Sequence, residues 1–172
     1  MKKILISAGA VAALALTSAP AAATPVSATA NAKAKIYKPL TIAQINGKDL
    51  DFATIVLSGT GPYTDSISVS QAGAITCGTH VTCSGTASNA GFTLTGTKNA
   101  KVAVSLPSAT VTLAGTNTPA NTLTVTLSAP ASAVDLGTTG TANFGVGGSL
   151  SVSDTTPDDL YTAQFTVNAD YQ

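Results

Sequence analysis

The sequence predicts an all-β protein, an antiparallel β-sandwich of the immunoglobulin-like type. The strongest observation is the C-terminal run from Tyr161 to Gln172, in which apolar and polar residues alternate without a break. Side chains of a strand point to opposite faces with a period of two, so this run is typical of a strand with one buried face. Thr, Ser, Ala, Gly and Val dominate the chain, which has no Glu, Arg or Trp. That composition favours strands and turns over surface helices.

The start of the chain, residues 1–23, has the pattern of a secretory signal peptide. Met1-Lys2-Lys3 supplies a charged start, an apolar stretch follows, and small residues then offer cleavage sites. Cleavage after Ala23 is the first choice, and cleavage after Ala30 is the alternative. The apolar stretch is shorter than the roughly 18 residues that a membrane-spanning helix needs. We therefore expect export by a Sec-type signal, transit through the periplasm, and a final place on the cell surface or in an extracellular filament.

Residues 24–38 are predicted to form an arm ahead of the domain. A second alternating run lies here, and its apolar face carries Val26, Ala28, Ala30, Ala32, Ala34 and Ile36. As a strand this run spans roughly 37 Å, enough to cross a sandwich. Three interpretations are open: a low-complexity tether, the domain's own first strand, or a donor strand that fills a gap in a neighbouring subunit by β-augmentation. The unbroken alternation argues against the tether.

Residues 39–172 contain short alternating runs that are separated by turn residues. Turn signals rich in Gly, Pro, Asn and Asp fall at 59–62, 89–91, 115–119 and 154–159. Many short strands at this spacing predict a sandwich, with a closed barrel as the second choice. The apolar residues of the runs are Leu50 and Phe52, Ile67 and Val69, Phe92 and Leu94, Val102, Val104 and Leu106, Val111 and Leu113, Leu123, Val125 and Leu127, Leu150 and Val152, and in the last strand Phe165, Val167 and Tyr171.

The two cysteines, Cys77 and Cys83, are predicted to form a disulfide, because an even number in an exported chain favours one. The segment between them looks like a hairpin with its tip at residues 78–80. Closing so small a loop stabilises a fold by about 2 kcal/mol in the chain-entropy model. A metal site would need more ligands than two Cys and the single histidine, His80, so we expect the disulfide and no metal.

The sequence contains no signature of an enzyme or of a cofactor site. His80 has no nucleophile and orienting carboxylate beside it in the pattern of a catalytic triad, and we expect it to be exposed at the hairpin tip. Gly145 to Gly148 lacks the helix that follows a nucleotide-binding loop, so it is expected to mark a bulge or kink between strands. Asp154, Asp158 and Asp159 could collect a calcium ion, but a turn before the last strand is the simpler interpretation. We expect a protein that is not an enzyme.

The charge of the mature chain argues against nucleic acid as a partner. Six lysines follow the signal peptide and face eight aspartates, so the mature chain is slightly negative. A basic patch that could neutralise phosphates is therefore missing.

Four segments carry a resemblance to a known family: Pro39–Ile42, Asp49–Phe52, Phe144–Val152 and Tyr161–Tyr171. They resemble family 4402 of the bacterial domains of unknown function, and the resemblance covers most of residues 32–172. Ala53 stands where the family pattern has Gly. The resemblance implies an exported protein of a family in which some members are encoded with a fimbrial chaperone and usher.

The C-terminus also resembles that of chaperone–usher pilins, which close with an alternating strand and an aromatic residue next to last, here Tyr171. We therefore expect a pilin-like structural subunit of a surface filament that serves in cell adhesion. Its expected partners are other copies of itself or related pilins, a periplasmic chaperone and an outer-membrane usher. The alternative is a self-contained secreted or surface domain that binds carbohydrate or protein. Such a module would be expected to expose aromatic residues, whereas most of the four Tyr and four Phe fall at apparent core positions.

Overall fold

The computed structural model describes residues 24–172, so the predicted signal peptide lies outside the described residues. The chain divides into two units between Lys35 and Ile36, and the second unit, Ile36–Gln172, is the β-domain. This domain therefore begins three residues before Pro39, the start expected from the sequence. From residue 24 to 172 the chain forms no helix, and so none that could cross a membrane.

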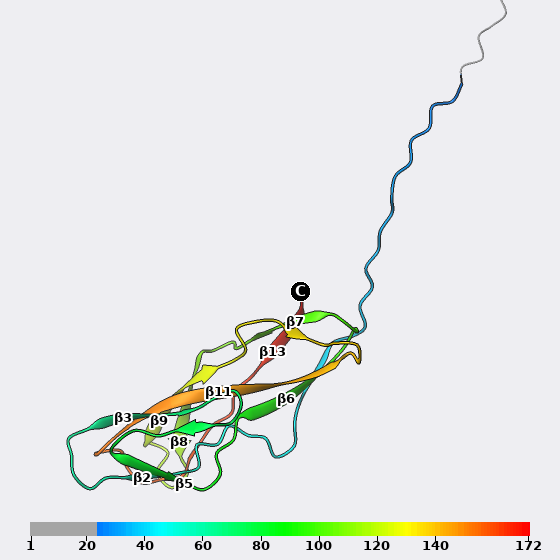
Figure 1. Cartoon of the computed structure of the whole chain (residues 1–172). Coiled ribbons are helices and arrows are strands. Elements are labelled where there is room, and N and C mark those ends of the chain that lie inside the picture. Colours follow the sequence, from blue (N-terminus) through cyan, green and yellow to red (C-terminus); the bar gives the residue numbers. More distant parts are fainter. Residues whose placement is uncertain (1–23) are drawn as a thin grey trace, which may run out of the picture. The chain divides into compact units, whose positions relative to one another are not determined.

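Thirteen strands make up the β-domain (Figure 1). They are β1 (Thr41–Gln44), β2 (Thr54–Leu57), β3 (Thr64–Val69), β4 (Ile75–Thr76), β5 (Val81–Ser84), β6 (Ala90–Thr95), β7 (Lys101–Ser105), β8 (Thr110–Gly115), β9 (Thr122–Ser128), β10 (Val134–Asp135), β11 (Thr141–Ser153), β12 (Tyr161–Thr162) and β13 (Asn168–Tyr171). Every pairing between them is antiparallel. The prediction of an antiparallel all-β sandwich is confirmed.

One large sheet and two small ones form the two layers of the sandwich. The large sheet has the order β1-β6-β11-β9-β8-β12, and β3 also pairs with β11 and carries β4 beside it. The small sheets are β2-β5 and β10-β7-β13. The path of the large sheet ends at β1 and β12 without joining them, so the barrel alternative is not realised.

The long strand β11 carries two hydrophobic cores on one face, because alternate residues of a strand share a face. Val146, Leu150 and Val152 belong to the larger core, which lies under β2-β5 and includes Val81 of β5. Ala142 packs against the smaller core, which lies under β10-β7-β13. Phe144 packs against both. Figure 1 shows β2 and β5 at one end of the domain and β7 and β13 at the other. The second layer is therefore built from two separate pieces.

The expectation of a bulge or kink between strands at Gly145 to Gly148 is wrong. These residues lie inside β11, at the point where the strand exchanges β6 for β9 and β3 as its partners. A Cβ atom at Gly147 would collide with the carbonyl oxygen of Val69, and one at Gly145 would collide with the side-chain amide of Asn89. Glycine is needed here because neighbouring groups approach the strand closely.

The C-terminal run Tyr161–Gln172 was expected to be one strand, and that expectation is wrong. It forms β12 in the large sheet and β13 in a small sheet, and the residues between them belong to no strand. The segment crosses from one layer to the other, which breaks the hydrogen-bond ladder while the alternation continues. Phe165 and Val167 fill the larger core during this crossing, and Tyr171 packs against the smaller core.

The Cys77–Cys83 disulfide is confirmed, but the hairpin expected around it is wrong. β4, just before Cys77, pairs with β3 in the large sheet, whereas β5, which contains Cys83, pairs with β2 in a small sheet. A hairpin would require these two strands to pair with each other. The disulfide instead closes a corner at which the chain passes between the two layers.

Candidate functional site

The predicted donor segment pairs with no strand within residues 24–172. Residues 24–40 belong to no strand, and the side chains of Val26 and Ile36 are 99% and 86% exposed. An isolated strand leaves its backbone N–H and C=O groups without protein partners. The alternating pattern is therefore not realised as a strand in the single chain, and the donor role of Val26 to Ile36 stays a prediction.

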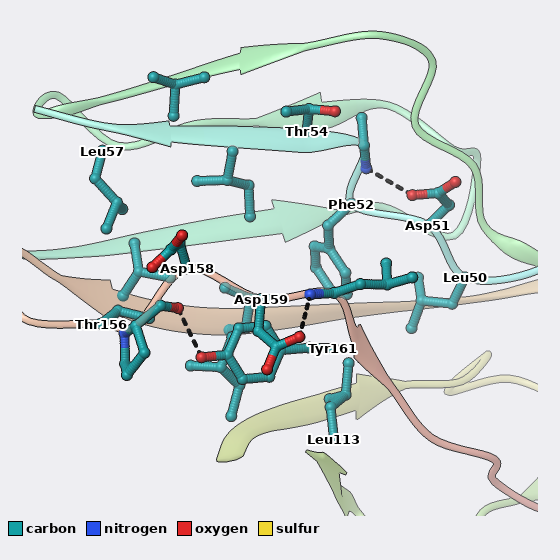
Figure 2. Close-up of a pocket in the computed structure, with 18 residues that line it drawn as sticks. Leu50, Asp51, Phe52, Thr54, Leu57, Leu113, Thr156, Asp158, Asp159 and Tyr161 are labelled. Carbon is teal, nitrogen blue, oxygen red and sulfur yellow. Dashed lines mark hydrogen bonds between the residues drawn. The ribbon is translucent and has the colours of Figure 1, made fainter. Parts of the chain in front are cut away.

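An apolar groove of about 580 Å³ opens beside β2 (Figure 2). Its floor consists of inward-facing residues of the large sheet, including Leu113, Leu150 and Val152. Leu50 and Phe52 lie at one end of it, in the segment that leads into β2. These side chains belong to the larger core or pack against it, so the groove reaches the edge of the core, where Phe52, Leu150 and Val152 stay buried and Leu50 and Leu113 are half-buried. The groove lies in the sandwich where more second-layer structure would cover that core.

One wall of the groove is an edge of β2. Ile55 and Leu57 are half-buried and point toward the core, whereas Thr54 and Val56 are exposed, and Val56 is 53% exposed. All four line the groove. Since successive side chains of a strand point to opposite faces, a cavity that touches all four must border the edge of the strand. Within residues 24–172, β2 pairs with β5 alone. Its second edge therefore presents backbone groups that another strand could pair with.

The opposite wall, residues 156–161, is held rigidly by hydrogen bonds. Asp159 accepts hydrogen bonds from the N–H groups of Asn117, Thr118 and Leu160, at 2.9, 2.9 and 2.8 Å. These bonds, the one from Asn117 foremost, hold the pKa of Asp159 below its ordinary value. Tyr161 donates its hydroxyl to the carbonyl of Pro157 at 2.7 Å, and burial raises its pKa. Asp159 is thus an anion and Tyr161 a neutral phenol at neutral pH.

The turn that leads into β2 is strained. Ala53 has a φ of 58°, a left-handed conformation that glycine adopts much more readily than alanine. Its N–H donates to Oδ1 of Asp51 at 2.7 Å, as Figure 2 shows. The resemblance noted in the sequence implies Gly at this position, and glycine adopts this backbone conformation without strain.

A second, more polar slot of about 540 Å³ adjoins the groove and shares several lining residues with it. Leu50, Leu113 and Tyr161 line both, so Tyr161 lies between them. The slot continues past Phe92 and Phe165, beneath the segment that crosses between the layers.

The single histidine lies away from the groove. His80 donates its backbone N–H to Oδ2 of Asp65 at 2.5 Å, and its ring lies 5.0 Å from the ring of Tyr63. Its Nδ1 is 3.3 Å from Oδ1 of Asp65, and its side chain is 53% exposed. The Asp65 carboxylate thus stabilises the corner beside the disulfide.

Two acidic side chains that line the groove, Asp51 and Asp159, accept hydrogen bonds from backbone N–H groups. Within residues 24–172, no three His, Cys, Asp or Glu side chains gather as metal ligands. Of the three aspartates considered for calcium, Asp159 binds the loop at residues 117–118, and Asp158 is exposed on the groove rim.

Sequence reasoning did not find the groove. Its lining comes from segments far apart in the chain, and only two local signals pointed toward it: the Asp49–Phe52 segment and the acidic turn at 154–159. Both were noted in the sequence, the first as part of the family resemblance and the second as a turn. Neither pattern predicts that these two segments line the same groove.

Comparison with known proteins gives one family match. The model of a family described as a domain of unknown function, DUF4402, matches residues 40–171. None of the curated proteins and none of the solved structures gives a match. The matched range runs from the start of β1 to the end of β13 and includes every residue that lines the groove, while the arm precedes it. Because this range covers nearly the whole β-domain, the chain belongs to the DUF4402 family.

Proposed function

We propose that the protein is a pilin-like structural subunit of a bacterial surface filament, and that its subunits join when an extended arm enters the groove beside β2. The observation that carries this proposal is the edge of β2 that pairs with no strand of residues 24–172, next to an apolar groove lined by core residues. An added strand would bond to this edge through its backbone and would cover the apolar floor, which is the physical basis of β-augmentation.

The arm at residues 24–38 suits this role in shape and charge. Its apolar face would turn toward the floor, with Ile36 as the main anchor, because burying an isoleucine contributes about 2 kcal/mol and an alanine much less. Main-chain hydrogen bonds would supply much of the remaining hold. The polar face carries Lys33 and Lys35, and the rim of the groove carries the exposed carboxylates of Asp51 and Asp158. Opposite charges at the rim favour this occupant over a neutral one.

The remaining parts of the proposal rest on the sequence. Export by a Sec-type signal would bring the subunit to the periplasm, where a chaperone would cover the groove before an usher releases the subunit into a filament. On the cell surface the filament would serve adhesion. No catalytic step is part of this role, so we propose that the protein is not an enzyme.

Deletion of residues 24–35 tests the proposal, because this removes all of the arm before Ile36 and leaves the whole β-domain unit. The deleted chain is expected to form no polymers, and to melt at a lower temperature than the polymer because its groove stays open. Adding residues 24–38 after Gln172 through a flexible linker should restore a stable monomer. An arm-deleted chain that polymerises like the full mature chain would contradict the proposal.

A pair of single substitutions separates the two faces of the arm. Ile36→Asp would place a charge on the face that enters the groove, whereas Lys35→Asp changes the polar face. We expect Ile36→Asp to weaken assembly more, measured as the fraction of polymer by analytical ultracentrifugation. Equal effects of the two substitutions would speak against a groove-facing Ile36.

The groove also supports a second function, a self-contained binding domain. Its volume of about 580 Å³ lies within the range typical of small-ligand sites. In that case the arm-deleted chain would melt cooperatively at the same temperature as the full mature chain, and a carbohydrate or peptide would compete for the groove. The melting experiment therefore distinguishes the two functions.

A further inference from the structure

Tyr171, the next-to-last residue, holds the root of the arm. Its hydroxyl donates to the carbonyl of Lys38 at 2.9 Å and accepts the N–H of Thr97 at 2.8 Å. Its ring stacks on that of Tyr37, with centroids 4.3 Å apart and planes 9° from parallel. A Cβ atom at Gly96 would collide with the Tyr171 hydroxyl, so glycine leaves the space it occupies. We call these four residues, Tyr37, Lys38, Thr97 and Tyr171, the arm clamp.

The arm clamp and the groove lie at different ends of the β-domain. Thr97 follows the end of β6, where Thr95 pairs with Thr141 at the start of β11. The floor of the groove includes Leu150, near the other end of β11. Nine residues of strand separate Thr141 from Leu150, a distance of roughly 30 Å. Figure 1 shows the same separation, with β13 and β2 at different ends of the domain.

The length of the arm limits what it can reach in its own chain. From the clamp at Tyr37 back to Val26 there are eleven residues, roughly 37 Å when fully extended. Most of this length would be used in reaching the groove, so Ala32, Ala34 and Ile36 could not lie in it. The arm of a second copy has no such restriction and can place any part of its alternating face in the groove, including Ala32, Ala34 and Ile36.

We infer that the occupant of the groove is the arm of a second copy of this chain, and that the arm clamp prevents the arm from filling its own groove. This inference rests on the proposed function and adds the identity of the partner. Because the root of the arm and the groove lie at different ends of one domain, insertion of the arm into a neighbour would make a head-to-tail contact. Such a contact produces an open chain of subunits when successive rotations do not close a ring.

A linker insertion tests the inference directly. Inserting about ten Gly and Ser residues between Lys35 and Ile36 adds up to roughly 30 Å of reach, so the arm could then fill its own groove. We expect the wild-type chain to form polymers and the insertion variant to become mainly monomeric. In the insertion monomer, Lys33 and Lys35 should resist trypsin, whereas in wild-type monomers they should be cut rapidly. A matched control carries the same linker with Ala32→Asp and Ala34→Asp, and should lose the protection.

A single substitution tests the clamp itself. Tyr171→Phe keeps the ring and removes two hydrogen bonds, each typically worth about a fivefold change in an equilibrium. The variant should show faster hydrogen exchange at the Thr97 amide and at least a fivefold larger fraction of monomers with a protected arm. Tyr63→Phe, which removes a hydroxyl bond to Ser58 far from the arm root, is the control and should change neither.

The possible contrary outcomes bear on the inference, on the clamp and on the proposed function separately. A wild-type monomer whose arm already resists trypsin would overturn the inference, and so would an insertion variant that polymerises as fully as the wild type. An unchanged monomer fraction in Tyr171→Phe would overturn the role of the clamp. If deletion of the arm left polymers intact, the proposed function would fail first.

Discussion

Ala53 adopts a left-handed backbone conformation, with a φ of 58°, that is unfavourable for alanine. A non-glycine residue in the left-handed region carries a steric cost of about 1 kcal/mol, because Cβ crowds the following carbonyl. The other non-glycine residue with a positive φ is Asn99, at 56°, and asparagine tolerates this region better. The turn at Ala53 nevertheless forms, since Asp51 accepts its N–H and Phe52 beside it is buried in the larger core.

Ala53→Gly is expected to stabilise the protein. Relief of the strained φ should exceed the extra chain entropy of glycine, for a net gain of up to about 1 kcal/mol in the free energy of unfolding. Urea denaturation at neutral pH measures the change. Ala103→Gly, in the middle of β7, is the control and should destabilise by a similar amount, because glycine weakens strand interiors. A loss of stability at both positions would show that Ala53 is not strained.

Asp65 is expected to make folding sensitive to acid. The backbone N–H of His80, foremost among its contacts, holds the pKa of this buried carboxyl below its ordinary value. A carboxyl with a lowered pKa in the folded state stabilises the fold at neutral pH, and this contribution is lost as the pH falls through the folded pKa. Urea midpoints measured from about pH 6 to 2.5 should therefore fall less steeply in Asp65→Asn than in the wild type, because the titration window lies below about pH 4.

His80→Ala is the matched control for this effect. The substitution keeps the backbone N–H that binds Asp65, so most of the acid dependence should remain. It should also leave folding and assembly intact at neutral pH. A large loss of function with an unchanged fold would instead assign His80 a chemical role.

At the scale of elements, the domain repeatedly changes layers within a short stretch of chain. β4 and β5 lie in different sheets, and so do β7 and β8, and β12 and β13. Each change interrupts a hydrogen-bond ladder, so each needs another interaction to hold it. Between β12 and β13, Phe165 and Val167 pack against the larger core, and between β4 and β5 the Cys77–Cys83 disulfide closes the corner.

Reduction of the disulfide should lower stability without changing the fold. The bonded cysteines are separated by only six positions in sequence, so the closed loop is small, and its loss is expected to cost about 2 kcal/mol in the free energy of unfolding. Unfolding curves with and without reductant measure the difference, and a Cys77→Ala, Cys83→Ala variant should match the reduced protein. Protein isolated from the periplasm should show no free thiols by alkylation and intact mass. Two alkylated thiols in that material would be inconsistent with the bond.

At the scale of the whole molecule, residues 24–172 comprise a β-domain and an arm that pairs with none of the strands described. The β-domain has an apolar groove that borders its core, and the arm exposes an alternating apolar face. The apolar face of an arm could therefore cover the apolar groove of a β-domain. This complementarity suits a subunit that is completed by assembly.

Trypsin should separate the two units in the monomer and spare them in the polymer. Lys33 and Lys35 lie in the arm, whereas the bond after Lys38 precedes Pro39 and is a poor trypsin site. Brief digestion of monomers is expected to leave a fragment that begins at Ile36, detected by mass spectrometry. In polymers the same bonds should be cut at least tenfold more slowly, because a bound strand must leave the groove before cleavage, a change worth about 1.4 kcal/mol. Equal cleavage rates in both states would argue against arm insertion.

The sequence by itself determined the properties that depend on local pattern. Alternation identified the inward face of β9 and of the second half of β11, and composition and turn residues predicted an all-β sandwich. The even number of cysteines predicted the disulfide. These features follow from nearby residues because the period of two belongs to each strand separately.

Only the tertiary structure decided which elements meet. Alternation from Tyr161 to Gln172 states which side chains face inward, but not that the segment pairs with β8 at one end and β7 at the other. The groove and the arm clamp likewise join segments that are distant in sequence, such as Lys38 and Tyr171. Strand pairing over such distances depends on how the layers close around a common core, and a local period contains no information on the choice of partner.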